Sequence, residues 1–252
     1  MPAGIAAETF ALARARAVSL ERARGGIGTL GEKTLHAVLK YYYEADEARH
    51  EVKIGPFVAD IVGEDGIVEI QTRSFERLRK KLEAWLEVCA VTVVYPIPNQ
   101  KWLLWIDGET GEITKKRKSP KRGGIHDALP ELYKIRQLLS HPNFALCIAL
   151  VDLEEYRRLD GWSRDKKRGS TRCERIPVGL AGEHLFRCPG DYLAFVPGSL
   201  AERFTTRDLA RAVKIPLRTA QTGLNILHHL GAVRRVGKQG NLYVYERAPQ
   251  IL

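Results

Sequence analysis

The chain of 252 residues has few cysteines and no long apolar run. Its longest uninterrupted apolar stretch, Phe144 to Val151, is far shorter than the roughly 20 residues that a membrane-spanning helix needs. We therefore expect no membrane partner and a cytoplasmic location. The four cysteines stand far apart without a C-x-x-C pair, and nothing near the N-terminus resembles a secretory signal. We expect reduced thiols; zinc binding by Cys173 and Cys188 is an alternative whose spacing matches none of the usual patterns.

Acidic residues are also scarce relative to basic ones. Forty Lys and Arg residues face 30 Asp and Glu residues, which leaves a net charge of +10. Such a balance favours a polyanionic partner, because Lys and Arg displace the counterions condensed on nucleic acid. Residues 201–252 carry nine basic and three acidic residues, and so hold +6 of the total. We expect the binding function in this basic tail.

The chain shows no internal repeat. The dipeptides Gly25-Gly26 and Pro197-Gly198 divide it into three parts. Residues 1–26 are rich in Ala and Arg, a composition shared with transit peptides, but Glu8 and Glu21 favour a helical or frayed N-terminal extension. A stretch rich in Gly and Pro ends at Pro197-Gly198, where we place a domain boundary. The expected domains span residues 27–197 and 200–248.

The apolar pattern of the larger domain predicts an α/β fold with a mixed sheet. Spacings of three to five residues predict a helix from Thr29 to Tyr42, and Ser74 is the expected N-cap of a second one. Three alternating stretches between them predict strands at residues 50–54, 57–62 and 66–71. "AVTVVYPIP", "KWLLWID" and "FALCIALV" read as further strands. A helix from Leu153 to Leu159 and then irregular chain are expected up to the boundary.

Two of these strands carry carboxylates where burial is otherwise expected. Glu69 and Gln71 are two residues apart and share one face of their strand, and a hairpin closed by Gly63-Glu64-Asp65-Gly66 would bring Asp60 into the same locality. Neighbouring carboxylates repel unless a cation resolves the arrangement, and Mg²⁺ or Mn²⁺ would do so. The alternative is a solvent-facing Asp60 and a Glu69 that pairs with Lys53 or Arg73 on the surface.

Asp60 and the Glu69-x-Gln71 pattern, with a helix before them and a basic helix after them, resemble the core of the PD-(D/E)XK nuclease superfamily. The resemblance spans about residues 29 to 106. It implies a restriction-endonuclease-like mixed sheet flanked by helices and a Mg²⁺ or Mn²⁺ ion held by Asp60, Glu69 and the carbonyl of Ile70. It also implies that Glu32 is an acid contributed by the first helix.

The pattern departs from that superfamily at two positions. Ala59 stands where many members have Pro. Gln71 stands where most have a Lys that positions or deprotonates the attacking water, so Gln71 would align the water through its amide, or Lys53 or Arg77 would supply the cation. The stretches "SPK" and "GWS" also resemble a widespread group of bacterial proteins with the same two parts, a likeness that implies no activity.

The segment from Phe204 to Arg247 predicts two helices, at residues 207–213 and 217–230, and two strands, at 232–236 and 242–245. This order resembles a small winged helix-turn-helix domain, which implies that the second helix enters the major groove of double-stranded DNA while the hairpin touches the backbone. An alternative is a winged helix used for protein contacts. The expected DNA-binding residues are Arg218, Thr219, Gln221, Thr222 and Asn225 on the helix, and Arg234, Arg235 and Lys238 on the hairpin.

Together these features predict a metal-dependent DNA endonuclease, associated with the nucleoid and targeted by its winged helix. A homodimer would suit cleavage of both strands. One alternative is a non-catalytic DNA-binding regulator with a degenerate nuclease-like domain. Another is RNA processing, because the basic stretches "KKRKSPKR" and "RDKKRGSTR" do not distinguish the two polymers. The first of these stretches is equally well explained as a solvated loop.

Overall fold

The computed structural model of the chain describes residues 3–23, 33–161 and 169–249. It contains two compact units, each made of three separate segments. The first unit comprises Met1–Gly63, Pro96–Gly124 and Ala149–Glu183, and the second comprises Glu64–Tyr95, Ile125–Ile148 and His184–Leu252. Residues on both sides of Pro197 belong to the second unit, and the domain boundary expected there stays a prediction.

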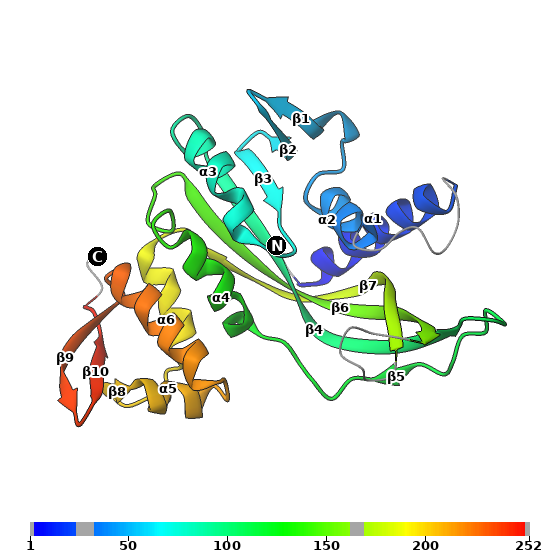
Figure 1. The fold of residues 1–252 in the computed structure, drawn as a ribbon. Coiled ribbons are helices and arrows are strands. Elements are labelled where there is room, and N and C mark those ends of the chain that lie inside the picture. The colour runs from blue at the N-terminus through cyan, green and yellow to red at the C-terminus, as the bar shows by residue number, and fades with distance from the viewer. Residues whose placement is uncertain (1–2, 24–32, 162–168, 250–252) are drawn as a thin grey trace. The chain divides into compact units, whose positions relative to one another are not determined.

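The fold is mixed α/β, with a large mixed sheet and flanking helices, as expected (Figure 1). The sheet order in the described part of the chain is β1-β2-β3-β4-β6-β7, and β5 pairs with β4 beside this path. Strands β1 and β2 are antiparallel, whereas β3 and β4 are parallel, which makes the sheet mixed. The strands are β1 (His50–Ile54), β2 (Phe57–Gly63), β3 (Gly66–Ile70), β4 (Val91–Asp107), β5 (Arg117–Lys118), β6 (Phe144–Gly161) and β7 (Gly169–Phe186).

Helices of very different length accompany these strands. Within the described ranges, none of them combines the length and the apolar character needed to cross a membrane. The α-helices are α1 (Ala3–Ala23), α2 (Lys33–Tyr43), α3 (Arg79–Leu86), α4 (Leu129–Leu132), α5 (Thr206–Ala212) and α6 (Leu217–His229). The 3-10 turns are η1 (Glu47–Arg49), η2 (Phe75–Leu78), η3 (Ile125–Ala128), η4 (Tyr133–Ile135) and η5 (Pro189–Phe195).

In the first unit, helix α1 packs beside α2 (Figure 1). Phe10, Ala13 and Ala17 are buried on one stripe of α1, at the spacing of three and four residues that a helix face requires. The Phe10 ring meets Tyr42 edge-on, with ring centroids 5.5 Å apart. The two small alanines bring the helices close together, so the described part of the N-terminal segment is a packed helix.

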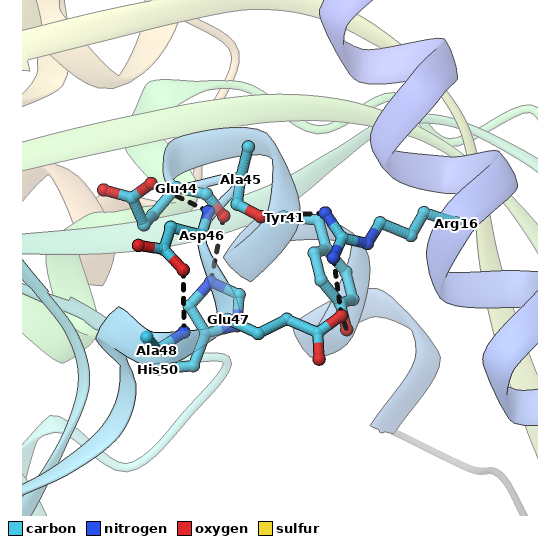
Figure 2. Close-up of polar contacts among 8 residues, drawn as sticks. All are labelled: Arg16, Tyr41, Glu44, Ala45, Asp46, Glu47, Ala48 and His50. Atoms are coloured by element: carbon cyan, nitrogen blue, oxygen red, sulfur yellow. Dashed lines mark hydrogen bonds and ion pairs between the residues drawn. The ribbon is translucent and has the colours of Figure 1, made fainter.

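A polar network fastens α1 to the turn that follows α2 (Figure 2). The Arg16 guanidinium donates to the Ala45 carbonyl at 2.8 Å and to Glu47 Oε1 at 2.7 Å. The Tyr41 hydroxyl donates to the same carboxylate oxygen at 3.0 Å. These hydrogen bonds, that of Tyr41 first and that of Arg16 second, hold the pKa of Glu47 below its ordinary value. The network is exposed and orients α1 more than it stabilises the unit.

In the second unit, β3 and β4 are joined by the crossover helix α3. The parallel pairing runs from Ile67 opposite Val91 to Ile70 opposite Val94. Helix α3 buries Leu82, Trp85 and Leu86, as its apolar spacing predicts. Ser74 does not cap this helix as expected, because it adopts a left-handed conformation without a side-chain cap bond, and η2 precedes α3.

Two segments have a different secondary structure from the one that their sequence predicts. The helix expected from Leu153 to Leu159 is wrong, because these residues continue β6 as an extended strand. The irregular chain expected after residue 168 is wrong over Gly169–Phe186, which is strand β7. Pro177 lies in β7, the last strand in the sheet order, and edge strands are where proline is found in sheets. The two strands expected within residues 90–107 are one continuous strand, β4.

A buried ion-pair cluster explains why the charged stretch of β6 is a strand. Glu155 is 1 % exposed and alternates with half-buried neighbours, which is the period of a strand. Its carboxylate accepts from Arg157 at 2.5 Å and lies 3.5 Å from the Lys101 ammonium and 3.7 Å from the Arg175 guanidinium. Two of these cations come from β4 and β7, so the partners that permit burial are distant in sequence.

The C-terminal module, residues 203–247, contains the two helices and the hairpin that its sequence predicts. A further strand, β8 (Arg203–Thr205), joins β9 (Val233–Gln239) and β10 (Leu242–Arg247) in an antiparallel sheet of order β8-β10-β9. Thr205 and Asp208 form a reciprocal capping box at the start of α5. Gly231, at φ 72°, follows the end of α6. The buried apolar core consists of Phe204, Leu209, Ala220, Leu224, Ile226, Leu227, Leu230, Ala232, Val233 and Tyr245.

Candidate functional site

Asp60 lies in the middle of β2 in the first unit. Its neighbours Ala59 and Ile61 are buried, so Asp60 projects from the opposite face of the strand, where it is half-buried. Its Oδ2 lies 3.1 Å from the Nε2 atom of His36, a half-buried residue of α2. The structure therefore places an imidazole, rather than bulk solvent, against this carboxylate.

A second carboxylate and a second base complete a cluster on the same face. The β1–β2 register, with His50 opposite Ile61, puts Glu51 across from Asp60. Lys40, one helical turn after His36, donates to Glu51 Oε1 at 2.7 Å. The hydrogen bond from Lys40, and then its charge, hold the pKa of Glu51 below its ordinary value. Two basic side chains of α2 are thus paired with two carboxylates of the neighbouring strands.

Glu69 on β3 has a different environment in the second unit. The residue is 3 % exposed, and its Oε1 accepts a hydrogen bond of 2.6 Å from the Lys81 ammonium of α3. The same ammonium lies 5.3 Å from the centre of the Trp85 ring. A buried carboxylate requires such a partner, because an unpaired charge in the interior is strongly unfavourable. Lys81 is thus a partner of Glu69 that the sequence analysis did not name beside Lys53 and Arg73.

Gln71 follows the end of β3 and contacts the next turn of the chain. Its side-chain nitrogen donates to the carbonyls of Arg73 and Ser74, and its backbone N–H donates to Val94 O at 2.9 Å. The amide thus stabilises the turn that leads into α3. Ile70, whose carbonyl is a predicted metal ligand, is 2 % exposed.

The structure places the predicted metal ligands in two separate units, Asp60 in the first and Glu69 in the second. Carboxylate oxygens are the donors that Mg²⁺ and Mn²⁺ prefer, so the residue types fit such an ion. In the described part of the chain, however, no three His, Cys, Asp or Glu side chains are gathered in a way that would hold a metal. The structure brings Asp60 to His36 and Glu69 to Lys81; a shared ion stays a prediction. Glu32 lies outside the described residues.

Two residues that the sequence analysis did not assign are therefore the direct partners of the carboxylates. Lys81 is one of the basic residues of the helix that follows β3, and Arg77, the alternative cation, is exposed. The sequence signal for Lys81 was the order strand, helix, strand. A helix that connects two parallel strands packs on them, so some of its basic side chains lie close to the strand residues. His36 carried a comparable signal, since it follows the buried Leu35 on α2.

The predicted DNA-binding residues lie at the surface of the C-terminal module. On α6, Arg218, Gln221 and Asn225 are exposed, while Thr219 and Thr222 are half-buried. The Thr222 hydroxyl donates to the Arg218 carbonyl at 3.0 Å. On β9, the predicted residues Arg234, Arg235 and Lys238 are all exposed. Arg234 pairs with Glu246 of β10, so its positive charge is partly neutralised and contributes less to an anion-binding surface.

A groove with a volume of about 220 Å³ lies between α6 and the β9–β10 hairpin. It contains three of the predicted residues, Gln221, Asn225 and Arg235. It also contains Asn241 and Tyr243, which the sequence analysis did not select. Tyr243 is 41 % exposed, and the Arg235 guanidinium lies 4.2 Å from the centre of its ring. The sequence offered no direct signal for Tyr243, because its place beside Arg235 results from the pairing of β9 with β10.

The basic stretch at residues 115–122 is exposed almost throughout. Lys116 donates to Glu154 at 2.6 Å and lies 4.8 Å from the centre of the Trp102 ring. Both the solvated-loop and the phosphate-contacting interpretations of this stretch therefore stay open. Much of the second basic stretch falls outside the described residues.

Four free cysteines agree with the expectation of reduced thiols. Cys188 belongs to the capping box of η5, in which Asp191 accepts from its backbone N–H at 3.0 Å. The Cys173 thiol donates to the Thr171 carbonyl. Within the described segments neither cysteine joins a metal-binding group.

Comparisons with known proteins give a family and a relative. The family described as "Domain of unknown function (DUF8091)" matches residues 33–187, which is more than half of the chain. A protein of Treponema pallidum (strain Nichols), described as an "Uncharacterized protein", is 29% identical over 230 residues and covers 88% of each chain. No solved structure matches. The match to the relative covers more of the chain than the family match does.

Proposed function

The chain belongs to the DUF8091 family, and from its own residues we propose that it is a metal-dependent DNA endonuclease targeted by a winged-helix module. The observation that carries the proposal is the ion pair between Glu69 and Lys81, at 2.6 Å. In the PD-(D/E)XK resemblance, a lysine beside the strand carboxylate serves the attacking water, and Gln71 leaves that position without a cation. Lys81 supplies an ammonium beside that carboxylate from the following helix.

Each group has a distinct role in this proposal. A bound Mg²⁺ or Mn²⁺ would polarise the scissile phosphate and lower the pKa of a water molecule. Asp60 and Glu69 are the carboxylates offered to the ion, with the Ile70 carbonyl as a further oxygen. Lys81 holds Glu69 in a single orientation and neutralises charge near the phosphate. His36 orients Asp60 by the 3.1 Å contact between Nε2 and Oδ2. Glu32 keeps its proposed role as an acid.

The C-terminal module supports the DNA-binding half of the proposal. Arg218, Gln221 and Asn225 project from one exposed face of α6, and Arg235 and Lys238 project from the hairpin beside it. An exposed helix face with guanidinium and carboxamide groups suits the major groove, whereas the basic hairpin suits the phosphate backbone. Double-stranded DNA is the proposed partner, and a homodimer remains the proposed form for cutting both strands.

A specific observation favours a second candidate, a DNA-binding regulator without catalysis. Both carboxylates already have basic partners, Asp60 in His36 and Glu69 in Lys81. Such pairs resolve the charge without any metal ion. On this proposal the α/β part is a scaffold and only the C-terminal module acts on DNA.

A plasmid-nicking assay separates the two candidates. The purified full-length protein is incubated with supercoiled plasmid in Mg²⁺, in Mn²⁺ and in EDTA, and DNA affinity is measured in parallel by fluorescence anisotropy. We expect metal-dependent nicking that Asp60→Asn and Glu69→Gln abolish and that Lys81→Met lowers by about 100-fold, with DNA affinity unchanged. Glu83→Gln, on an exposed part of α3, is the matched control and should nick at the wild-type rate.

The outcomes are distinct. A wild-type protein that binds the plasmid and leaves it intact with either metal supports the regulator. Nicking that survives both carboxylate substitutions contradicts the site assignment. Faster cleavage of a structured RNA than of the plasmid would identify RNA processing instead.

A further inference from the structure

The groove between α6 and the β9–β10 hairpin combines polar and aromatic side chains. Its walls carry three carboxamides, a guanidinium and two phenol rings, and none of the described residues that line it is acidic. The six are Gln221, Asn225, Asn241, Arg235, Tyr243 and Tyr245. Carboxamides and phenols also contact phosphates, but three carboxamides gathered beside a guanidinium and two phenol rings suit a ligand with polar edges and a flat face.

The carboxamides come from two elements and converge on one groove. Gln221 and Asn225 are one helical turn apart on the exposed face of α6, so they lie on the same side of the helix. Asn241 comes from the turn between β9 and β10. Each carboxamide offers both a donor and an acceptor, which is the combination that the edge of a nucleobase presents.

The opposite side of the groove provides a surface for stacking. The Arg235 guanidinium lies 4.2 Å from the centre of the Tyr243 ring and 5.9 Å from that of Tyr245. The Lys238 ammonium lies 5.2 Å from the centre of the Tyr243 ring. Planar guanidinium and phenol groups are the platforms on which unpaired bases stack, and the adjoining ammonium suits the phosphate of the same nucleotide.

We propose that this groove receives one unpaired nucleobase of the bound DNA, stacked against Arg235 and Tyr243 and contacted at its edges by Gln221, Asn225 and Asn241. The proposal rests on the DNA binding proposed for the C-terminal module. A paired base inside a duplex has both faces covered by its neighbours, so only an unpaired or extruded base presents a face to the groove. The module would thus favour DNA with a local defect over perfect duplex.

The test compares two fluorescently labelled DNA molecules with the full-length protein. One is fully paired, and the other has the same sequence with a single extra 2-aminopurine that bulges from one strand. We expect the bulged DNA to bind about tenfold more tightly than the paired one, a factor within the range for one base stacked on an aromatic side chain. We also expect the 2-aminopurine fluorescence to change on binding, because the base enters a new stack.

Substitutions assign the effect to the groove. Tyr243→Ala and Asn241→Ala should remove the preference and the fluorescence change while affinity for paired DNA is kept. Tyr243→Phe retains the ring and should retain the preference. Arg218→Ala, on α6 but outside the groove, should weaken both DNA molecules alike. Because Tyr243 and Asn241 are exposed, circular dichroism of these variants should match that of the wild type.

Two failures are distinguishable. Equal affinity for the paired and bulged DNA overturns the nucleobase proposal and leaves DNA binding intact. Absence of binding to either DNA overturns the DNA-binding function as well. A preference that persists in both Tyr243→Ala and Asn241→Ala, or tighter binding to a bulged RNA of the same sequence, also overturns the proposal.

Discussion

Lys81 donates to Glu69 across 2.6 Å and so joins helix α3 to strand β3 through a charged hydrogen bond. The Glu69 side chain is 5 % exposed, whereas that of Lys81 is 24 % exposed. The carboxylate is therefore the partner that depends on the pair, because only the lysine retains substantial access to water.

The first prediction concerns the stability that this pair provides. Lys81→Met removes the ammonium that the buried Glu69 carboxylate contacts at 2.6 Å, and should lower the free energy of unfolding by about 3 kcal/mol. Urea denaturation at neutral pH measures the change. Lys80→Met, on an exposed position of the same helix, should change it by no more than about 0.5 kcal/mol.

The double variant Glu69→Gln/Lys81→Met provides the check. It should lose less stability than the sum of the two single changes, because each single change strands the other partner. Additive losses would mean that the contact is energetically irrelevant.

The second prediction concerns Gly66, which opens strand β3. Its φ is 117°, and a Cβ built there would lie 2.3 Å from the Ala90 carbonyl oxygen. Gly66→Ala should lower the free energy of unfolding by at least about 3 kcal/mol, since backbone atoms would have to move in addition to the strain of positive φ. Gly55→Ala is the control, because Gly55 has a φ of 59° and no atom within 4 Å of a built Cβ. It should lose only about 1 kcal/mol. Equal losses would contradict the steric explanation.

The third prediction is the pH dependence that Glu155 gives to stability. Burial alone would raise the pKa of this carboxyl, but the hydrogen bond from Arg157 and the charges of Lys101, Arg157 and Arg175 outweigh it, and the pKa lies below its ordinary value of 4.5. A lowered pKa in the folded state means that the ionised form stabilises the fold above pH 4.5, and that this contribution is lost as the pH falls through the lowered value.

Arg157→Met should therefore reduce the free energy of unfolding at neutral pH, and the difference from the wild type should shrink as the pH falls toward about 3. Chemical denaturation across this range gives the measurement. Arg158→Met, at an exposed position of the same strand, should leave the pH profile unchanged. A difference that grows on acidification would contradict the sign of the pKa shift.

The fourth prediction concerns the capping box of the C-terminal module. Thr205 accepts from the Asp208 N–H and donates its hydroxyl to Asp208 Oδ2 at 2.6 Å. Thr205→Ala should lower the stability by about 1 kcal/mol, because the Asp208 N–H at the start of α5 loses its acceptor and the Asp208 carboxylate loses the Thr205 hydroxyl. Thermal unfolding detects the change as a lower Tm. Arg207→Ala, an exposed position in the same first turn, should alter the Tm little.

The fifth prediction is the salt dependence of DNA binding. If the basic surface of α6 and the hairpin neutralises about six phosphates, a plot of log Kobs against the logarithm of the salt concentration should have a slope of about −5 on duplex DNA. Lys238→Ala should reduce the magnitude of that slope by about 1, uniformly across sequences. Fluorescence anisotropy over a salt series measures both. A slope near zero would favour protein contacts as the role of the module.

Local pattern accounts for the elements around the candidate site. Strict alternation and the Gly55-Pro56 break indicate β1 and β2 where they are observed, and the stripe of Leu82, Trp85 and Leu86 indicates α3. The same reasoning gives a helix at residues 153–159 and fails, because Leu153, Tyr156 and Leu159 recur every three residues, a spacing that also fits one helix face. What makes it a strand is the neutralisation of Glu155 by Lys101 and Arg175, which no local window contains.

The sequence by itself determined the α/β class, the order of elements from α2 to β4 and the exposed basic face of α6, because the periods of strands and helices and the balance of charge are local properties. Only the tertiary structure decided which side chain meets each carboxylate. His36 reaches Asp60 from 24 residues away and Lys81 reaches Glu69 from 12 residues away. The reason is physical: a buried charge is satisfied by whichever opposite charge the packing of another element brings within a hydrogen bond, and residue spacing along the chain does not encode that packing.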